Sequence, residues 1–151
     1  MFLQREDLKN NIYNYQLDQI TEGDEGIVMQ AMQAAEDEAR SYMEANIYQK
    51  ENQDGRLIYD TDAIFAATGE DRHALIVQQC ITIAKWYIVD LCNVDIIYEQ
   101  AKERYDRATA WLTKLAGGDI VLKNLPTNEI SEEDTELKPF SFGSRPKFNY
   151  E

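Results

Sequence analysis

The sequence predicts a mainly α-helical protein: a small helical bundle of three long helices plus a short N-terminal helix around a buried central helix, with an extended C-terminal tail. Two observations carry this prediction. Apolar residues recur at spacings of three and four along three long stretches, which is the period of an amphipathic helix. One of these stretches, residues 71–93, is apolar around most of its circumference, so other elements must surround it.

Two helices are predicted before the central one. Residues 5–15 have early acidic residues and helically spaced apolar positions, which favours a short helix. Residues 25–48 form the second long helix, and small alanines on its apolar face allow a neighbouring helix to approach closely. That face consists of Val28, Met32, Ala35, Ala39 and Tyr42.

The loop at residues 49–70 interrupts this periodicity. Asp54-Gly55 is a turn signal, with a weak hairpin possible around it, and residues 63–67 have the pattern of a helical turn. A loop this long in a small domain usually has a function or forms an interface. We therefore expect contacts between subunits here, on the opposite side of the bundle from the tail. The candidate residues are Arg56, Leu57, Ile58, Tyr59 and Phe65.

The central helix, residues 71–93, has two adjoining apolar rows and a narrow polar strip formed by Gln78, Thr82 and Lys85. Lys85 and Asp90 interrupt it too often for a membrane span. Cys80 and Cys92 both lie on it, roughly 18 Å apart at the rise of an α-helix, which is too far for a disulfide. They are expected to be small buried residues of a protein in a reducing compartment.

The C-terminal third combines a helix with a tail of another kind. A fourth helix is predicted from about residue 95 to 116 and ends at Gly117-Gly118, and residues 119–125 suit one strand. We divide the chain into a bundle domain, 1–118, and an extended arm, 119–151. Residues 137–151 are rich in proline and aromatic residues and locally basic, which suggests docking on a partner. The candidate partner-binding residues are Phe140, Phe142, Arg145, Pro146, Lys147, Phe148 and Tyr150.

The composition limits the classes of function. The formal net charge of −13 argues against non-specific binding to DNA or RNA, because the phosphates would be repelled, and favours a basic protein partner. The first residues contain no apolar run long enough for a signal peptide, so we expect synthesis in the cytoplasm.

The sequence contains few residues in the patterns of catalytic or metal-binding sites. His73 has no nucleophile beside it in a recognisable motif and is interpreted as a first-turn or loop residue. One histidine and two distant cysteines do not make a zinc site, residues 18–25 lack the pattern of a calcium loop, and no phosphate-binding loop is present. Aromatic residues 86, 87, 105 and 111 are interpreted as core. We therefore expect no enzyme activity, no cofactor and no metal.

Several segments occur in an informative order along the chain. They are FLQREDL (2–8), QIT (19–21), EGDEG (22–26), VMQAMQAAEDEARSYM (28–43), a hydrophobic helix, and the stretches 98–122 and 143–149. The most specific pieces are ERYDRATAWLTKLAGGDIVL (103–122) and Arg-Pro-Lys-Phe (145–148). In this order the segments resemble the small head–tail joining (connector or adaptor) proteins of tailed phages and Mu-like prophages, and the resemblance covers nearly the whole chain.

The resemblance implies a structural virion protein at the head–tail interface, made in the bacterial host. Its copies would form a ring under the portal, a dodecamer by analogy, and would contact the portal protein and the tail or neck proteins. Genomic DNA would pass through the channel without sequence-specific binding, and no membrane would be involved. The alternative is an acidic interaction module, a regulator that mimics DNA toward a basic protein partner; the charge of −13 fits both.

Overall fold

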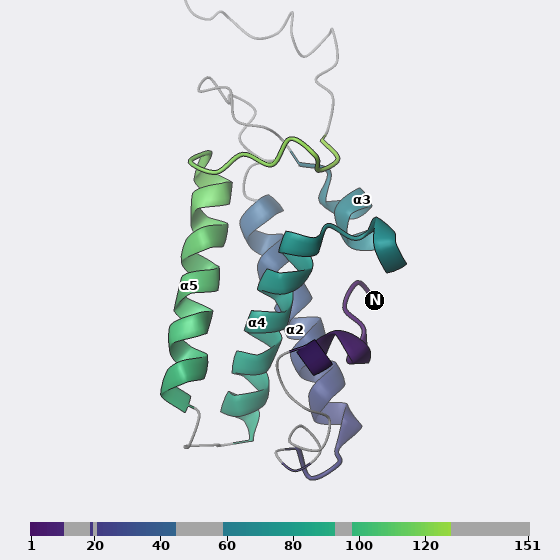
Figure 1. Ribbon diagram of the computed structural model, residues 1–151, viewed down its shortest axis with the longest axis vertical. Coiled ribbons are helices and arrows are strands. Elements are labelled where there is room, and N and C mark those ends of the chain that lie inside the picture. The colour runs from purple at the N-terminus through teal and green to yellow at the C-terminus, as the bar shows by residue number, and fades with distance from the viewer. Residues whose placement is uncertain (11–18, 20, 45–58, 93–97, 128–151) are drawn as a thin grey trace, which may run out of the picture.

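Three long helices form the body of the protein in the computed structural model, which describes residues 1–10, 19, 21–44, 59–92 and 98–127. They are α2 (Glu25–Glu44), α4 (Ala74–Leu91) and α5 (Tyr98–Gly117). Helix α4 packs against both α2 and α5, and α2 also contacts α5 (Figure 1). This arrangement confirms the predicted small helical bundle. Three short elements complete the described chain: η1 (Arg5–Asn10), α3 (Thr61–Ala66) and η2 (Gly69–Asp71).

Helix α4 is the central helix, as the sequence predicts. Its buried side chains come from both predicted apolar rows, and they include Ile76, Cys80, Ile81, Ile83 and Ile88. Within the described residues it is the one helix that is long and apolar enough to cross a membrane by length and composition, and half of that stretch is buried inside the subunit. Core helices of soluble proteins can have the same length and apolar composition.

The polar strip predicted on α4 is partly wrong. Lys85 is 9% exposed, and its charge lies near that of Arg104 on α5. The two cysteines are free, as expected, but only Cys80 is fully buried; Cys92 is half-buried at the helix end. Burial raises the pKa of the Cys80 thiol.

Helix α2 places its predicted alanine face in the core. Val28, Met32, Ala35 and Ala39 are all buried, and the described helix ends at Glu44; the predicted continuation to residue 48 lies outside the described residues. Glu36 is buried as well, and its Oε2 accepts a hydrogen bond of 2.9 Å from the Leu3 N–H. This bond helps to hold the N-terminal residues on the bundle.

A carboxylate joins the three long helices along one side. The Tyr87 hydroxyl of α4 and the Tyr105 hydroxyl of α5 both donate to Glu38 of α2, the latter at 2.8 Å. Burial, followed by the effect of Glu38, raises the pKa of Tyr87 to about 12. Trp86 is buried beside Tyr105, with ring centroids 5.5 Å apart. Trp111 is half-buried and packs on the core, so the interpretation of these aromatic residues as core is confirmed.

The chain leaves α5 through a left-handed glycine, Gly118, with a φ of 87°. The predicted strand at 119–125 is wrong: residues 119–127, which we name the crossing segment, contain no strand and pass over the end of the bundle (Figure 1). Within the described chain the crossing segment forms one isolated antiparallel β-bridge, between Thr127 and Tyr59. A β-strand needs a longer series of paired residues. The possible hairpin around Asp54-Gly55 lies outside the described residues, whereas the predicted helical turn is confirmed as α3.

Candidate functional site

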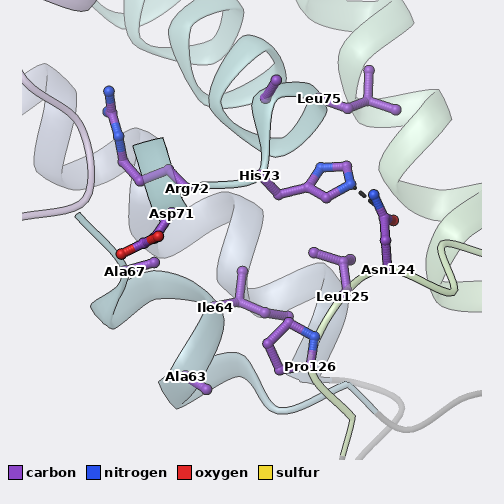
Figure 2. Close-up of a pocket in the computed structure, with 11 residues that line it drawn as sticks. Ala63, Ile64, Ala67, Asp71, Arg72, His73, Leu75, Asn124, Leu125 and Pro126 are labelled. Carbon is purple, nitrogen blue, oxygen red and sulfur yellow. Dashed lines mark hydrogen bonds between the residues drawn. The ribbon is translucent and has the colours of Figure 1, made fainter. Parts of the chain in front are cut away.

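A pocket of about 480 Å³ opens at the end of the bundle where α4 begins. We name it the end pocket. Its volume lies within the range usual for ligand sites. It is enclosed by α3, η2, the first turn of α4 and the crossing segment (Figure 2). The lining residues are Ala63, Ile64, Ala67, Asp71, Arg72, His73, Ala74, Leu75, Asn124, Leu125 and Pro126.

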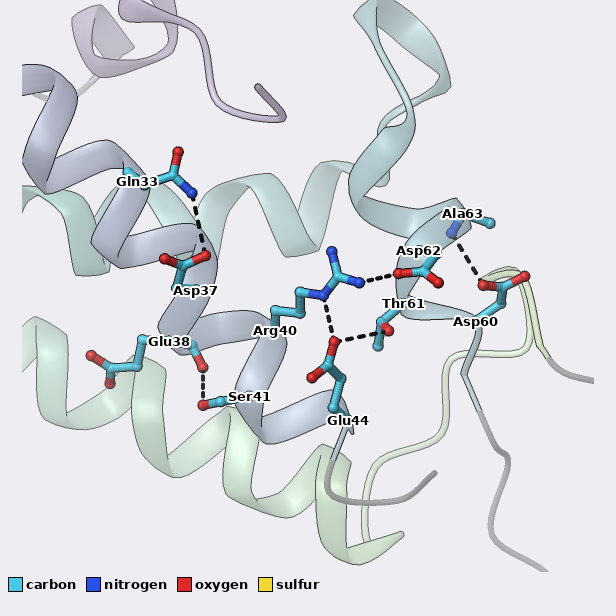
Figure 3. Close-up of polar contacts among 10 residues, drawn as sticks. All are labelled: Gln33, Asp37, Glu38, Arg40, Ser41, Glu44, Asp60, Thr61, Asp62 and Ala63. Atoms are coloured by element: carbon cyan, nitrogen blue, oxygen red, sulfur yellow. Dashed lines mark hydrogen bonds and ion pairs between the residues drawn. The ribbon is translucent and has the colours of Figure 1, made fainter. Parts of the chain in front are cut away.

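Helix α3 forms one wall and is fixed by side chains at its first turn. The Asp60 carboxylate caps the helix by accepting a hydrogen bond of 3.1 Å from the Ala63 N–H. Arg40 of α2 pairs with both Asp62 and Glu44 (Figure 3). Glu44 also accepts a bond from the Thr61 hydroxyl. A helix of six residues is only marginally stable by itself. These contacts with the end of α2 therefore fix the position of α3.

The crossing segment forms the opposite wall and is tied to the chain before α3. The Asp60 N–H donates to the Pro126 carbonyl at 2.9 Å, next to the Tyr59–Thr127 bridge. The Leu122 N–H donates to the Tyr59 hydroxyl at 3.1 Å. Leu125 is 5% exposed and belongs to the core. The part of the predicted arm that the structure describes therefore lies on the bundle.

His73 stands between these walls, at the N-cap of α4, where its side chain caps no backbone N–H. Its Nε2 lies 3.0 Å from the Asn124 Oδ1 (Figure 2), which assigns the proton to Nε2 because a carboxamide oxygen only accepts. Nδ1 is then an acceptor, and it is buried without a hydrogen-bond partner in the described structure. Within the described structure His73 therefore adds an acceptor without a protein partner to the pocket.

Arg72 lines the pocket and joins the end of η2 to the N-terminal residues. Its guanidinium makes two bonds to the Asp7 carboxylate, at 2.6 and 3.0 Å, and one of 2.9 Å to the Phe2 carbonyl. Burial acts to raise the pKa of Asp7, but hydrogen bonds from Arg72 and from the Gln4 N–H outweigh it, so the pKa lies below its usual value. Arg72 also lies over the Phe2 ring, 5.8 Å from its centroid. This clamp fixes one edge of the pocket.

The lining of the pocket combines apolar and polar side chains. Alanine, isoleucine, leucine and proline side chains supply an apolar lining, and the polar groups are Asp71, Arg72, His73 and Asn124. No serine or cysteine nucleophile occurs among the lining residues that the structure describes. A group of three or more histidine, cysteine or acidic side chains able to hold a metal is likewise absent from the described ranges.

The predicted site residues are distributed unevenly. Tyr59 and Phe65, predicted to contact a neighbouring subunit, are 2% and 9% exposed; Tyr59 supports the crossing segment, and Phe65 packs on Phe2 with ring centroids 5.0 Å apart. Their role between subunits stays a prediction. The other predicted contacts, residues 56–58 and 140–150, lie outside the described residues.

The expectation that the loop and the tail, residues 137–151, lie on opposite sides of the bundle stays a prediction, because the tail lies outside the described residues. Residues 59–70 and the crossing segment meet at the same end, through the Tyr59–Thr127 bridge. Sequence reasoning also missed that His73, Asn124 and Leu75 share a pocket. The available signal was that Leu75 falls in neither apolar row of its helix, and the structure shows it 37% exposed.

Comparison with known proteins found no matching protein family, no matching curated protein and no matching solved structure.

Proposed function

We propose that this chain is a structural head–tail connector of a tailed phage, whose copies form a ring under the portal and join the head to the tail. The observation that carries the proposal is the sequence resemblance, above all the segment 103–122 and the Arg-Pro-Lys-Phe at 145–148. An acidic helical bundle is compatible with this role, since an acidic channel wall repels DNA and lets it slide.

The geometry adds a second argument. The segment 103–122 forms most of α5, the turn at Gly118 and the start of the crossing segment. The most specific part of the resemblance therefore leads directly to the end pocket. A partly apolar pocket at the end of the described chain suits a protein whose work is to hold neighbours together.

Portal binding tests the proposal. Purified full-length chain is mixed with phage heads that carry a portal, and with heads that lack one, and both are sedimented through a gradient. The chain should sediment with portal-bearing heads alone, and a variant lacking residues 137–151 should not sediment with either. Equal binding to both kinds of head, or to neither, would contradict the connector function.

A second candidate is favoured by the net charge of −13: an acidic regulator that occupies the DNA site of a basic protein. It predicts that the chain displaces DNA from a nuclease or repressor of the same host and has no affinity for portal or capsid. The two candidates give opposite results in the head-binding experiment.

A further inference from the structure

We propose that the end pocket receives residues 137–151 of a second copy of this chain, which places an aromatic side chain between α3 and the crossing segment. The choice of a second copy as the occupant rests on the proposed connector function. The pocket itself, and its match to this segment, are independent of that function.

The apolar parts of the two surfaces correspond. The pocket presents Ala63 and Pro126 on one side and the exposed Leu75 on the other, and the buried Ile64 and Leu125 lie beneath its apolar lining (Figure 2). A volume of about 480 Å³ with this lining suits a large apolar side chain. The segment 137–151 carries several such side chains next to two prolines, namely Phe140, Phe142, Phe148 and Tyr150. Aromatic residues anchored in pockets supply most of the energy of many interfaces.

The charges correspond as well. Asp71 lines the pocket, Glu70 is exposed beside it on η2, and Asp62 is exposed on α3. The segment brings three basic side chains, Lys138, Arg145 and Lys147, against one acidic residue, Glu151. In a chain of net charge −13 this is a local reversal of sign, and opposite potentials steer an encounter and fix its orientation.

The segment 137–151 is joined to the pocket of its own copy through the nine residues 128–136, since Pro126 lines the pocket. A second copy is the occupant because a connector has to join neighbouring copies, and a segment folded into its own pocket would join none. Sedimentation distinguishes the two, because a segment bound in its own copy would leave the wild-type chain monomeric.

Such a contact has the form that a ring needs. The pocket and the segment are different surfaces of one chain, so each copy gives its segment to one neighbour and receives that of another. Repetition of this heterologous contact closes a ring or extends a filament, depending on the rotation between copies.

Complementation between two full-length variants tests the proposal. Leu75→Lys removes an apolar lining residue and repels the basic segment, whereas Phe140→Ser, Phe142→Ser and Phe148→Ser together remove the anchors. Sedimentation velocity is run from about 5 to about 500 µM, a range suited to a weak contact. The wild-type chain should associate with rising concentration, and each variant alone should remain monomeric. Their equimolar mixture should form a one-to-one dimer, since each variant supplies what the other lacks.

Leu91→Lys is the matched control, because Leu91 is a leucine of the same helix, 45% exposed and at the far end. It should associate like the wild type. A synthetic peptide of residues 137–151, in excess, should dissociate the wild-type assemblies. A wild-type chain that stays monomeric throughout, a Leu75→Lys variant that associates normally, or a mixture that remains monomeric overturns the proposal. If Leu75→Lys still joins portal-bearing heads, the pocket inference fails while the connector function stands.

Discussion

At the scale of single residues, Lys85 is the clearest departure from an optimised core. Its side chain is 9% exposed, and burial, followed by repulsion from Arg104, lowers its pKa from 10.5 to about 8. The fold therefore penalises the charged ammonium at neutral pH. Between about 8 and 10.5 the unfolded chain binds more protons at this residue than the folded chain does, so the contribution of Lys85 to stability rises with pH over that interval.

Replacing Lys85 by methionine should stabilise the protein at pH 7 by roughly 1–3 kcal/mol, since the pKa shift sets the size of the penalty. The advantage should shrink as the pH rises from 8 toward 9.5, because the wild-type lysine then loses its proton in the folded state. Urea unfolding at pH 7, 8.5 and 9.5 measures both effects. Lys114→Met, at an exposed position on α5, is the control and should change stability by less than about 0.5 kcal/mol. A destabilised Lys85→Met variant would contradict this account.

At the scale of elements, short segments are positioned by side chains rather than by their own propensity. The 3₁₀ helices η1 and η2 are joined by the Asp7–Arg72 pair, whose side chains are both 14% exposed. Helix α3 depends on the Asp60 cap and on Arg40. The Asp7–Arg72 and Arg40–Asp62 pairs connect residues that are far apart in the sequence, and together with the Asp60 cap they position the walls of the end pocket.

Asp7→Asn should lower the free energy of unfolding at pH 7 by roughly 2 kcal/mol, because it removes a charged partner of Arg72. The folded pKa of Asp7 is lowered, so its stabilisation is present above the ordinary aspartate pKa and is lost as the pH falls through the lower folded value. The difference between wild type and variant should therefore shrink in acid. Urea titrations from pH 7 down to about pH 3 measure it. The exposed neighbour supplies the control, Glu6→Gln, and an equal loss in both variants would refute the clamp.

At the scale of the whole molecule, the sequence was sufficient for the bundle and insufficient for the pocket. The rows through Ile76 and Ile81, and the alanine face of α2, encode helices locally, since their spacing is a property of neighbouring residues. The pocket depends on contacts such as Tyr59 with Thr127 and His73 with Asn124, which no periodicity records. The strand predicted at 119–125 failed for the same reason, because apolar residues in an extended run do not reveal whether a pairing partner is present.

The burial of Lys85 was missed for a related reason. A lysine within an apolar helix is normally assigned to the solvent face, because its charge is costly to bury. Its burial depends on how α4 packs against α2 and α5 rather than on the spacing of residues within α4.

The connector proposal concerns assemblies, and an image of the assembly tests it most directly. The proposal places this chain in a tailed phage, and the measurement is a cryo-electron microscopy reconstruction of the neck of that phage. The account predicts a ring of three-helix bundles between portal and tail, with a segment of each copy seated in the end pocket of the next. A neck in which other proteins fill that position, with this chain absent from the particle, would contradict it.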